Sequence, residues 1–579
     1  MYLLQRMGLV ARAKTMTGSN ARVGKALVVD GARKASGHKT RHRIVLVMIG
    51  VCLVYGVIAG RLVQYGLRDL TTVASIARGD ALMASRPDLL DRNGQVLATD
   101  IRTVSLYAKP HKITDPDEVI ERLATVLPEL DVRSVYRKLT SKSQFQWLRR
   151  QLTPRQQNDI LALGIPGVGF RPEKRRFYPG GPTASHIVGH VNIDNKGIAG
   201  MEKYVDGQGL AALAAAGMTI ERQMEPVRLS LDLRVQHIVR DELAAAMQRY
   251  QAIAAGAVVL NAKTGEVLAM SSLPDYDPNI AAQALEKDRL NRMSAGTYEM
   301  GSTFKAFTTA MALDSGLINL GDSFDASKPI RIAGHTINDF HGKHRTLSVP
   351  EIFIYSSNIG TAKMADVVGV EGHQEFLTRI GLLTRMRTEL PEVAMPSQPK
   401  NWKKINSVTI SFGHGVATTP LQTAMSAAAM LNGGLLIPPT FLPRSQADAQ
   451  RVATRVIKSE TSAAMRYLMR LNVEKGSGRQ AEVPGFRIGG KTGTAEKVVN
   501  GRYSSAVRFN AFLSAFPIED PQYVVLVIID EPKPAEGQHS ATAGLNAAPT
   551  VKAIIRRSAA LLGVRPSFGE DGAALLVSY

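Results

Sequence analysis

An uncharged apolar run near the amino terminus divides this 579-residue chain into parts that must fold in different solvents. The run Ile44–Gly60 reads IVLVMIGVCLVYGVIAG, and after Arg61 the segment LVQYGL continues it to Leu67. Its uncharged length is at the short end for a helix that spans a bilayer, but the arginine side chain can reach the lipid headgroups and so extend it. We predict a transmembrane anchor helix over residues 44–67.

The charges on either side of the run predict its orientation. Residues 1–43 contain ten basic residues and one acidic residue, a net charge of +9, whereas the remaining 536 residues carry +12 of the total of +21. Positive flanks stay on the cytoplasmic side, so residues 1–43 are predicted to be a cytoplasmic basic tail. A cleaved signal peptide is disfavoured because Val57-Ile58-Ala59 lacks the first small residue of a cleavage site, and a buried core helix would not be uniformly apolar beside a basic tail. The mild excess of positive charge elsewhere argues against a nucleic-acid-binding protein.

The cysteine content limits the chemistry. Cys52 is the single cysteine, and it lies inside the apolar run. One thiol cannot form an internal disulfide, a four-cysteine zinc site or an iron–sulfur cluster. Any catalysis must therefore use serine, lysine, histidine or carboxylate side chains.

Turn signals and hydrophobic periodicity divide the rest of the chain near Val227. Residues 68–226 contain a hairpin signal at Asn93-Gly94 and helical periodicity in DEVIERLATVLPEL, and Arg175–Asn192 is loop-rich and then strand-like. No acid–base pair stands out there, which is typical of a structural or docking module. Residues 227–566 combine helices in LRVQHIVRDELAAAMQRY and TVKAIIRRSAALL with strands in AGAVVLNAKTGEVLAMSS, VRFNAFLSAFP and YVVLVIIDE. This pattern predicts an antiparallel sheet covered by helices, and residues 567–579 follow as a C-terminal tail.

A candidate nucleophile lies in Ser302-Thr303-Phe304-Lys305, a Ser-x-x-Lys sequence. Positions i and i+3 of a helix share a face, so the lysine amine can reach the serine hydroxyl and, when neutral, accept its proton. The same spacing occurs at Ser36–Lys39, but that copy lies in the basic tail with no apolar face behind it. The later copy is therefore the candidate.

Two further motifs follow it along the chain. Ser356-Ser357-Asn358 can supply a hydroxyl for proton transfer and an amide that holds a substrate peptide group. Lys491-Thr492-Gly493-Thr494 can form a strand that offers its backbone to an extended peptide, with hydroxyls for a carboxylate and a glycine that permits close approach. A second Lys-Thr-Gly, at Lys263–Gly265, precedes the nucleophile and is predicted to be a hairpin turn. The ordered triple is the signature of the penicillin-binding serine acyltransferases.

With these motifs, residues 44–565 resemble a class B penicillin-binding protein, a monofunctional peptidoglycan D,D-transpeptidase, of the division type that cross-links the septal wall. The resemblance extends to the flanking sequences DRNG, LDLRVQ, TGEVLAM, YEMGSTFK, SFGHGVATTPLQTA and AAP. Met300 stands where proline is usual in the family, and His414 stands where an aromatic residue is common. The resemblance implies a membrane-anchored multidomain α+β protein, with an elongated periplasmic pedestal domain of the dimerisation type over 68–226 and a transpeptidase domain over 227–566.

The resemblance also implies the catalytic roles. Ser302 attacks the carbonyl between the last two D-alanines of a stem pentapeptide and forms an acyl-enzyme, with Lys305 as the base. Ser356 and Lys491 complete the proton network, and Asn358 positions the stem-peptide backbone. An amine from a neighbouring stem then takes the acyl group.

Substrate contacts follow from the same resemblance. Thr492 and Thr494 lie where the terminal carboxylate would bind, with Gly493 between them. The backbone N–H groups of Ser302 and Thr494 would form the oxyanion hole. Penicillin and other β-lactams would acylate the serine as substrate mimics, and no metal or other cofactor is implied.

The family also implies a location and partners. The chain is expected to be a single-pass protein of the bacterial inner (cytoplasmic) membrane, with a cytoplasmic amino terminus and a periplasmic catalytic domain. Expected partners are the lipid bilayer, peptidoglycan stem peptides, β-lactams, a lipid-II polymerase and other division proteins, and no nucleic acid. Alternatives are a lateral-wall transpeptidase of the same class, a β-lactamase or D,D-carboxypeptidase, and a division-complex scaffold. A β-lactamase would leave the module ahead of Val227 unexplained.

Overall fold

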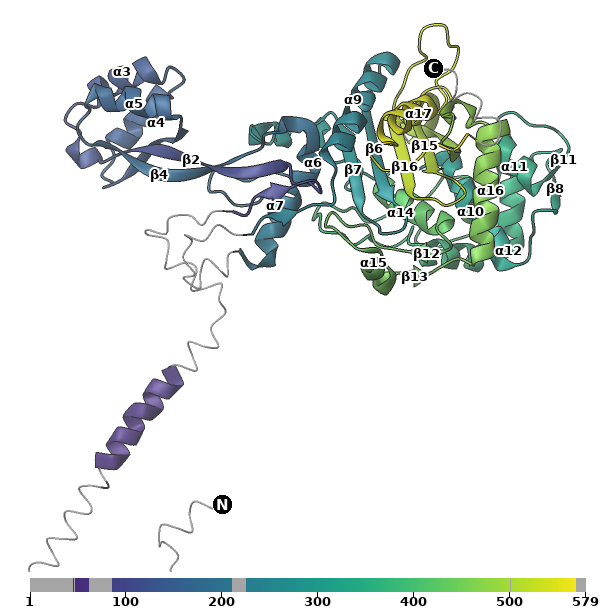
Figure 1. Ribbon diagram of the computed structural model, residues 1–579, viewed down its shortest axis with the longest axis horizontal. Coiled ribbons are helices and arrows are strands. Elements are labelled where there is room, and N and C mark those ends of the chain that lie inside the picture. Colours follow the sequence, from purple (N-terminus) through teal and green to yellow (C-terminus); the bar gives the residue numbers. More distant parts are fainter. Residues whose placement is uncertain (1–44, 46, 62–85, 211–224, 500, 569–579) are drawn as a thin grey trace, which may run out of the picture. The chain divides into compact units, whose positions relative to one another are not determined.

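The computed structural model describes residues 45, 47–61, 86–210, 225–499 and 501–568 (Figure 1). The chain divides into two compact units, Met1–Ala77 and Arg78–Tyr579. The second unit holds the three motifs that form the signature, from Ser302, Ser356 and Lys491 onward. The part of it over residues 86–210 is called the amino-terminal module below.

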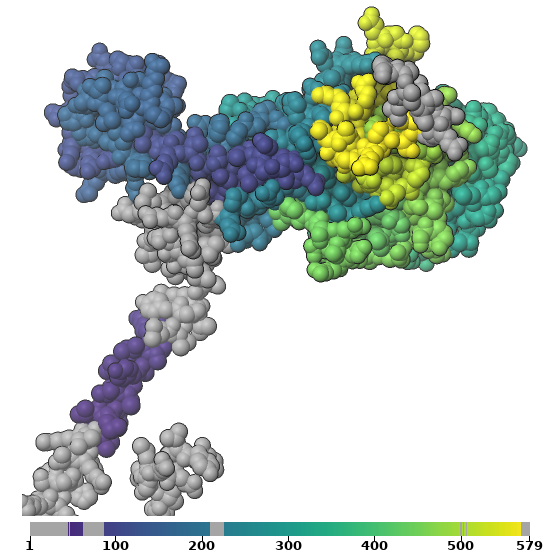
Figure 2. Space-filling model, in the orientation of Figure 1, coloured from purple at the N-terminus to yellow at the C-terminus, as the bar shows by residue number. Residues whose placement is uncertain are grey.

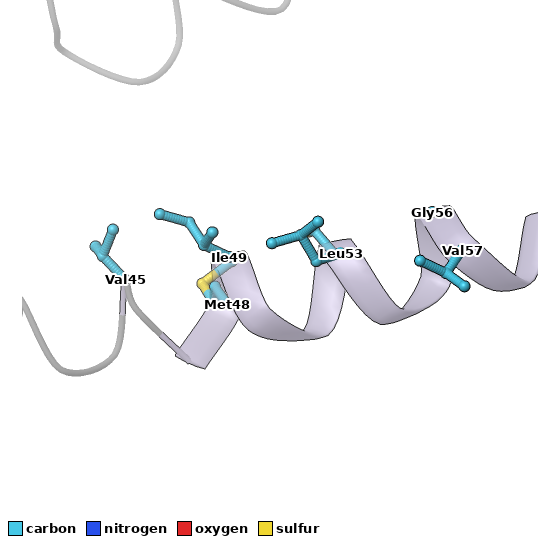
Figure 3. Close-up of a pocket in the computed structure, with 7 residues that line it drawn as sticks. Val45, Met48, Ile49, Leu53, Gly56 and Val57 are labelled. Atoms are coloured by element: carbon cyan, nitrogen blue, oxygen red, sulfur yellow. The ribbon is translucent and has the colours of Figure 1, made fainter.

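In the first unit, residues 47–61 are helical and carry exposed apolar side chains. Figure 3 shows Met48, Ile49, Leu53 and Val57 along this helix. Within the described ranges, no helix has both the length and the apolar character that a bilayer crossing requires. The rest of the predicted anchor and the whole predicted cytoplasmic tail, residues 1–43, lie outside the described residues.

The amino-terminal module is built on a long antiparallel ribbon. β2 (Val96–Ala108) pairs with β4 (Val168–Phe177) along its length and with β3 (Gln146–Leu152) at its end. The short β1 (Leu89–Leu90) pairs with β2 across the predicted turn, where the Asp91 carboxylate accepts the N–H groups of Asn93 and Gln95, both at 2.8 Å. The hairpin prediction is confirmed. Figure 2 shows the exposed atoms of β2 in purple, whereas Leu97 and Leu106 of the same strand are buried.

Three helices cover one part of the ribbon and form a small core with it. The core is centred on Leu106, Leu123 and Leu148. Each helix begins at a side chain that satisfies its first N–H groups; Asp115, Asp131 and Thr153 serve in this way. The helices are α3 (Pro116–Val126), α4 (Val132–Leu139) and α5 (Pro154–Leu163).

Five charged side chains form a buried network elsewhere in this module. Arg176 of β4 pairs with Glu202 at 2.6 Å and with Asp100 at 3.2 Å, and Arg86 pairs with Glu202 at 2.8 Å and with Asp206. Burial opposes the charge of Arg176, but the attraction of Glu202 and Asp100 raises its pKa above the ordinary value. The network ties the ribbon to α7 (Gly200–Val205), which carries Glu202.

The module is joined to the following region by backbone and side-chain contacts. β1 pairs in parallel with β5 (Val227–Arg228), and the amide of Asn279 exchanges two hydrogen bonds of 3.0 Å with the backbone of Tyr178. His186 of α6 (Ser185–Val188) bonds to the carbonyl oxygen of Arg289 at 2.7 Å. The boundary near Val227 stays a prediction.

A five-stranded sheet forms the centre of the remaining chain. Its order is β14-β15-β16-β6-β7, and all neighbours are antiparallel. The turn between β6 and β7 contains Lys263–Gly265, with Gly265 at a φ of +73°, so the predicted hairpin is confirmed. The strands are β6 (Ala254–Asn261), β7 (Val267–Leu273), β14 (Gly489–Val499), β15 (Arg502–Phe516) and β16 (Tyr523–Asp530).

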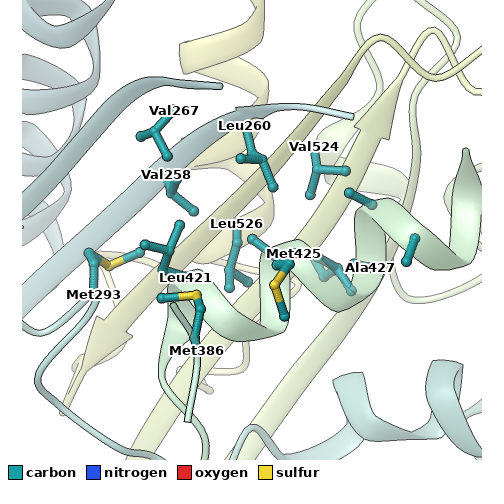
Figure 4. Packing of buried hydrophobic residues seen from close by; sticks show 14 of the residues in the cluster. Val258, Leu260, Val267, Met293, Met386, Leu421, Met425, Ala427, Val524 and Leu526 are labelled. Atoms are coloured by element: carbon teal, nitrogen blue, oxygen red, sulfur yellow. The ribbon is translucent and has the colours of Figure 1, made fainter. Parts of the chain in front are cut away.

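Helices cover both faces of this sheet, which confirms the predicted α+β arrangement (Figure 1). Val258 and Leu526 point to the face covered by α14, as Figure 4 shows, and Val259 and Val525 belong to the core of the opposite face. Burial on both faces explains why these strands are continuous apolar runs. One face carries α10 (Phe304–Ser315), α14 (Pro420–Leu431) and α16 (Ser459–Lys475), and the other carries α9 (Leu233–Tyr250) and α17 (Ala547–Ser558).

A mainly helical segment between β7 and β14 carries the second motif. It contains two-stranded ribbons from β8 (Ser323–Asp325) with β11 (Thr346–Ser348), β9 (Ile330–Ile332) with β10 (His335–Ile337), and β12 (Leu435–Leu436) with β13 (Thr454–Arg455). Its further helices are α11 (Val349–Tyr355), α12 (Asn358–Arg379), α13 (Lys404–Ser411) and α15 (Gln446–Val452).

Candidate active site

The candidate nucleophile lies in a tight turn at the start of α10. Ser302 belongs to a single 3-10 turn, Gly301–Thr303, and Lys305 is the second residue of the α-helix that follows. Ser302 is half-buried, whereas Lys305 is 2% exposed. Among the described residues, no hydrogen bond joins the Ser302 hydroxyl to the Lys305 amine. The helix brings the two residues close, but the amine is bound elsewhere.

The Lys305 amine is bound to the second motif. Nζ of Lys305 donates to the Ser356 hydroxyl at 3.1 Å and to the Ser356 carbonyl oxygen. Nζ of Lys491 donates to the same hydroxyl at 2.9 Å. The structure thus brings three of the predicted catalytic residues, from three motifs, around one oxygen atom.

Local backbone geometry explains why Ser356 can receive both amines. Ser356 caps the end of α11, and its φ of 57° places it in the left-handed region. Ser357 then caps the start of α12, and its hydroxyl accepts the Gly360 N–H at 2.9 Å. Ser356 therefore projects from a sharp turn between two helices rather than from a helix face.

Both lysines are buried, and neither forms an ion pair within the described part of the chain, which changes their proton affinity. Burial lowers the pKa of Lys305 well below its ordinary value, and repulsion from Lys491 lowers it further, against a weaker attraction from Asp339. Burial lowers the pKa of Lys491 to about 7. An amine with a lowered pKa is available as a neutral base near neutral pH. The site can therefore remove a proton from a serine hydroxyl.

Asn358 is the first residue of α12 and lies beside a loop that precedes it by twenty residues. Its side-chain Nδ2 donates to the Asn338 carbonyl oxygen at 2.8 Å. The neighbouring Asp339 carboxylate accepts the Ser357 hydroxyl at 2.7 Å and the Ile359 N–H at 2.9 Å. The motif is thus held by Asp339, a residue that the sequence did not single out.

β14 carries the third motif at the end of the sheet, and one of its edges has no partner strand among the described residues. A Cβ atom on Gly493 would lie 2.4 Å from the Met300 carbonyl oxygen, so only glycine lets the strand pack this closely on the nucleophile turn. The Thr492 hydroxyl lies 2.6 Å from the Ser477 hydroxyl, and the Thr494 hydroxyl accepts the Ala543 N–H at 3.1 Å. The predicted close approach at Gly493 is confirmed.

A second cluster next to the nucleophile turn was missed by sequence reasoning. The Glu299 carboxylate accepts the Gly415 N–H at 2.8 Å and the Tyr503 hydroxyl at 3.1 Å, and it contacts Nδ1 of His414 at 3.2 Å. Burial alone would raise the pKa of Glu299, but the hydrogen bonds from His414 and Gly415 lower it below its ordinary value. The signals for this cluster were the unusual His414 and the matching flanks that contain Glu299 and Gly415.

Comparison with known proteins identifies the chain. Residues 255–556 match the penicillin-binding protein transpeptidase domain, and residues 81–210 match the penicillin-binding protein dimerisation domain. The chain belongs to the penicillin-binding proteins. The resemblance to class B members of the division type is confirmed, and the relatives below carry names that agree with it.

Three relatives illustrate the similarity. The probable peptidoglycan D,D-transpeptidase FtsI of Caulobacter vibrioides is 39% identical, over 91% of this chain and 89% of its own. The probable peptidoglycan D,D-transpeptidase PenA of Neisseria gonorrhoeae is 33% identical, over 85% of this chain and 87% of its own. The peptidoglycan D,D-transpeptidase FtsI of Escherichia coli is 30% identical, over 79% of this chain and 81% of its own.

Within this penicillin-binding protein, the two departures from the family pattern both lie at the nucleophile turn. Met300 is fully buried, and its carbonyl oxygen faces Gly493. His414 follows Gly413, where a Cβ atom would lie 1.9 Å from the Gly301 carbonyl oxygen. Among the described residues, no group of three or more histidine, cysteine or acidic side chains is arranged to hold a metal ion.

Proposed function

We propose that this penicillin-binding protein is a peptidoglycan D,D-transpeptidase that cross-links stem peptides at the division septum through an acyl-enzyme on Ser302. The names of its relatives support the reaction class. The observation that carries the proposal is the Ser356 hydroxyl between two buried lysine amines, at 3.1 Å and 2.9 Å. This arrangement can accept a proton from the Ser302 hydroxyl and deliver a proton to the nitrogen of the leaving group.

In the acylation step, neutral Lys305 accepts the proton of the Ser302 hydroxyl as the serine oxygen bonds to the carbonyl carbon between the two D-alanines. Backbone N–H groups of Ser302 and Thr494 stabilise the negative charge that develops on the carbonyl oxygen. The bond to the terminal D-alanine nitrogen then breaks, and this nitrogen receives a proton through Ser356, which both Lys305 and Lys491 contact. D-Alanine leaves, and the rest of the stem peptide stays on the serine as an ester.

In the second step, the amine of a neighbouring stem attacks the ester carbonyl and displaces the Ser302 oxygen, which regains a proton from the same network. The new bond is the cross-link. The open edge of β14 supports binding of an extended peptide, because an unpaired strand edge presents free N–H and C=O groups. Asn358 binds the peptide backbone, and Thr492 and Thr494 bind the terminal carboxylate. No metal or organic cofactor is needed for these steps.

The proposed location is the bacterial inner membrane, with residues 44–67 as a single anchor, residues 1–43 in the cytoplasm and the catalytic domain in the periplasm. The exposed apolar side chains of the helix over residues 47–61 support this, because such a surface is stable only in contact with lipid or protein. Proposed partners are the bilayer, a lipid-II polymerase and other division proteins.

The test is labelling by a fluorescent penicillin of membranes that carry the wild type or Ser302→Ala. We expect a stable adduct on the wild type and none on the variant. Lys497→Met is a suitable control, because Lys497 lies on the same strand as Lys491 but pairs with Asp530 at 2.9 Å. A labelled Ser302→Ala protein would place the nucleophile elsewhere, and rapid release of hydrolysed penicillin would indicate a β-lactamase.

A further inference from the structure

The Thr494 hydroxyl accepts a hydrogen bond from the protein backbone, and this limits where its own proton can point. The Ala543 N–H donates to Oγ1 of Thr494 at 3.1 Å. A hydroxyl group has one proton, and an N–H group cannot accept it, so the Thr494 proton must point to a different acceptor. Thr492 is not constrained in this way, because its hydroxyl lies 2.6 Å from that of Ser477 and either can donate.

Two buried asparagines hold the segment that carries Ala543. Nδ2 of Asn510 donates to the Ala541 carbonyl oxygen at 2.6 Å and to Oδ1 of Asn546 at 3.0 Å. The same Oδ1 accepts the Ala547 N–H at 2.7 Å, where α17 begins. Asn510 and Asn546 are 0% and 1% exposed. Both ends of the segment over residues 541–547 are therefore fixed to one side chain of β15.

The sheet register places this side chain beside the hydroxyl that the segment orients. Asn510 of β15 lies directly opposite Thr494 of β14. Residues directly opposite each other in an antiparallel pair project to the same face and are near neighbours. A short chain of contacts thus runs from Asn510 through the segment to Ala543 and back to Thr494.

Each amide of the pair uses only one of its two polar groups within the described residues. Oδ1 of Asn510 and Nδ2 of Asn546 are buried without a hydrogen-bond partner among the described residues. A buried polar atom without a partner is unfavourable, and apolar residues of similar shape would avoid this loss. The remaining groups, Nδ2 of Asn510 and Oδ1 of Asn546, are the ones that hold the 541–547 segment.

We propose that Asn510 and Asn546 are positioning residues for recognition of the substrate's terminal carboxylate. They hold the Ala543 N–H against Thr494, so that the Thr494 proton is directed to the carboxylate rather than to the protein. This inference rests on the proposed function, in which that carboxylate binds beside β14. It predicts that the two asparagines affect only ligands that carry the carboxylate.

The test compares two acylating probes on the full-length protein in detergent: benzylpenicillin, which has a free carboxylate, and its methyl ester. The rate of adduct formation is measured by intact mass for the wild type, Asn510→Ala, Thr494→Val and the double variant. We expect Asn510→Ala to slow acylation by benzylpenicillin about tenfold, the order of a hydrogen bond to a charged group. Acylation by the ester should change less than about twofold, and Asn510→Ala should have no further effect in the Thr494→Val background.

Ser514→Ala is the matched control. Ser514 is buried on the same strand, and its hydroxyl donates to the Val525 carbonyl oxygen at 2.9 Å, away from the 541–547 segment. The Ser514→Ala substitution should not change the ratio of the acylation rates with benzylpenicillin and its methyl ester. If thermal melting shows that Asn510→Ala does not fold, Asn546→Leu tests the same pair from its other member.

The outcomes separate this inference from the proposed function. An equal loss with both probes, or independent effects of Asn510 and Thr494, would overturn the positioning role and leave the acyltransferase proposal in place. Failure of both probes to acylate the wild type would overturn the proposed function, and the inference with it.

Discussion

The amino-terminal module and the active site each bury two cationic side chains, but they neutralise them differently. In the module, Arg86 and Arg176 lie among three carboxylates, and their side chains are 3% and 1% exposed. In the active site, Lys305 and Lys491 share the hydroxyl of Ser356, and neither forms an ion pair among the described residues. Burial disfavours the charged form of Arg176 and of both lysines, and of these three side chains only Arg176 has carboxylates whose attraction outweighs it.

The difference in pairing indicates a structural role for the arginines of the module and a chemical role for the lysines of the active site. Attraction from Glu202 and Asp100 outweighs burial and keeps Arg176 charged, so the module gains connections but no group that can transfer a proton. Burial lowers the pKa values of both lysines, that of Lys491 to about 7, so this site holds amines that can lose a proton. In this protein, the lysines of the reactive site have lowered pKa values and, among the described residues, no ion pairs, whereas the arginines of the structural network are paired with carboxylates.

The largest expected effect comes from removing one of the unpaired amines. Lys305→Met should reduce the rate of acylation by penicillin by roughly 10²–10⁴-fold, the usual contribution of a general base. The melting temperature should stay the same or rise, because methionine has no polar group to desolvate at this buried position. The rate is measured by adduct formation and the melting temperature by circular dichroism.

Lys497→Met provides the contrast for this prediction. Lys497 lies on β14 like Lys491, but it pairs with Asp530 at 2.9 Å and Glu531 at 2.6 Å. We expect a small loss of stability and little change in acylation. A Lys305→Met protein that melts well below the wild type but still acylates would contradict the assignment of the unpaired lysines to chemistry.

Removing a paired cation from the module should have the reverse effect. Arg176→Met leaves Glu202 and Asp100 buried with one guanidinium fewer, and breaking a buried ion pair in this way costs about 3–5 kcal/mol. Chemical denaturation should show this loss in the unfolding of the second unit. Molecules that remain folded should acylate at close to the wild-type rate, and a specific loss of acylation without loss of stability would assign the network a catalytic role.

Sequence reasoning identified the three motifs because their order along the chain is informative even where each motif is common. It also predicted the hairpins at Asn93-Gly94 and Lys263–Gly265, where turn residues act locally. The strand-like interpretation was wrong for Ser185–Val188, which form α6. There the β-branched residues favour a strand, but packing around Gly189, where a Cβ atom would lie 1.9 Å from the Ala199 carbonyl oxygen, decides the conformation.

The partners of the motif residues could not be predicted in the same way. Asp339 precedes Ser357 by 18 positions, and Tyr503 follows Glu299 by 204. Asn510 and Asn546 meet only because β15 and α17 pack together. These residues belong to common types with no local pattern, and the long-range packing that joins them is not encoded in any short segment. The same holds for the pairing of β16 with β6, whose strands are far apart along the chain.

A smaller effect should appear in the pH dependence of acylation. In the wild type the rate should rise with pH through about 7, as the coupled lysines lose a proton. Lys491→Met should lower the overall rate and also move this rise to higher pH, because repulsion from Lys491 helps to lower the pKa of Lys305. The measurement is the rate of adduct formation against pH, with each profile scaled to its own plateau. An unchanged midpoint would show that the two amines titrate independently.

The smallest expected effect concerns Glu299, a carboxylate beside the nucleophile turn that contacts neither lysine. Glu299→Gln should destabilise the protein by roughly 1 kcal/mol at pH 7, because weaker bonds would replace those from Gly415, Tyr503 and His414. The pKa of Glu299 lies below its ordinary value of 4.5 in the folded protein, so its contribution is fully present above that pH and is lost as the pH falls through the folded pKa. The melting temperatures of wild type and variant should therefore differ at pH 7 and converge under acid conditions.

Tyr503→Phe removes one donor and leaves the charge, so its difference from the wild type should be smaller at pH 7. Curves that stay parallel down to low pH would show that Glu299 acts through packing rather than through its charge.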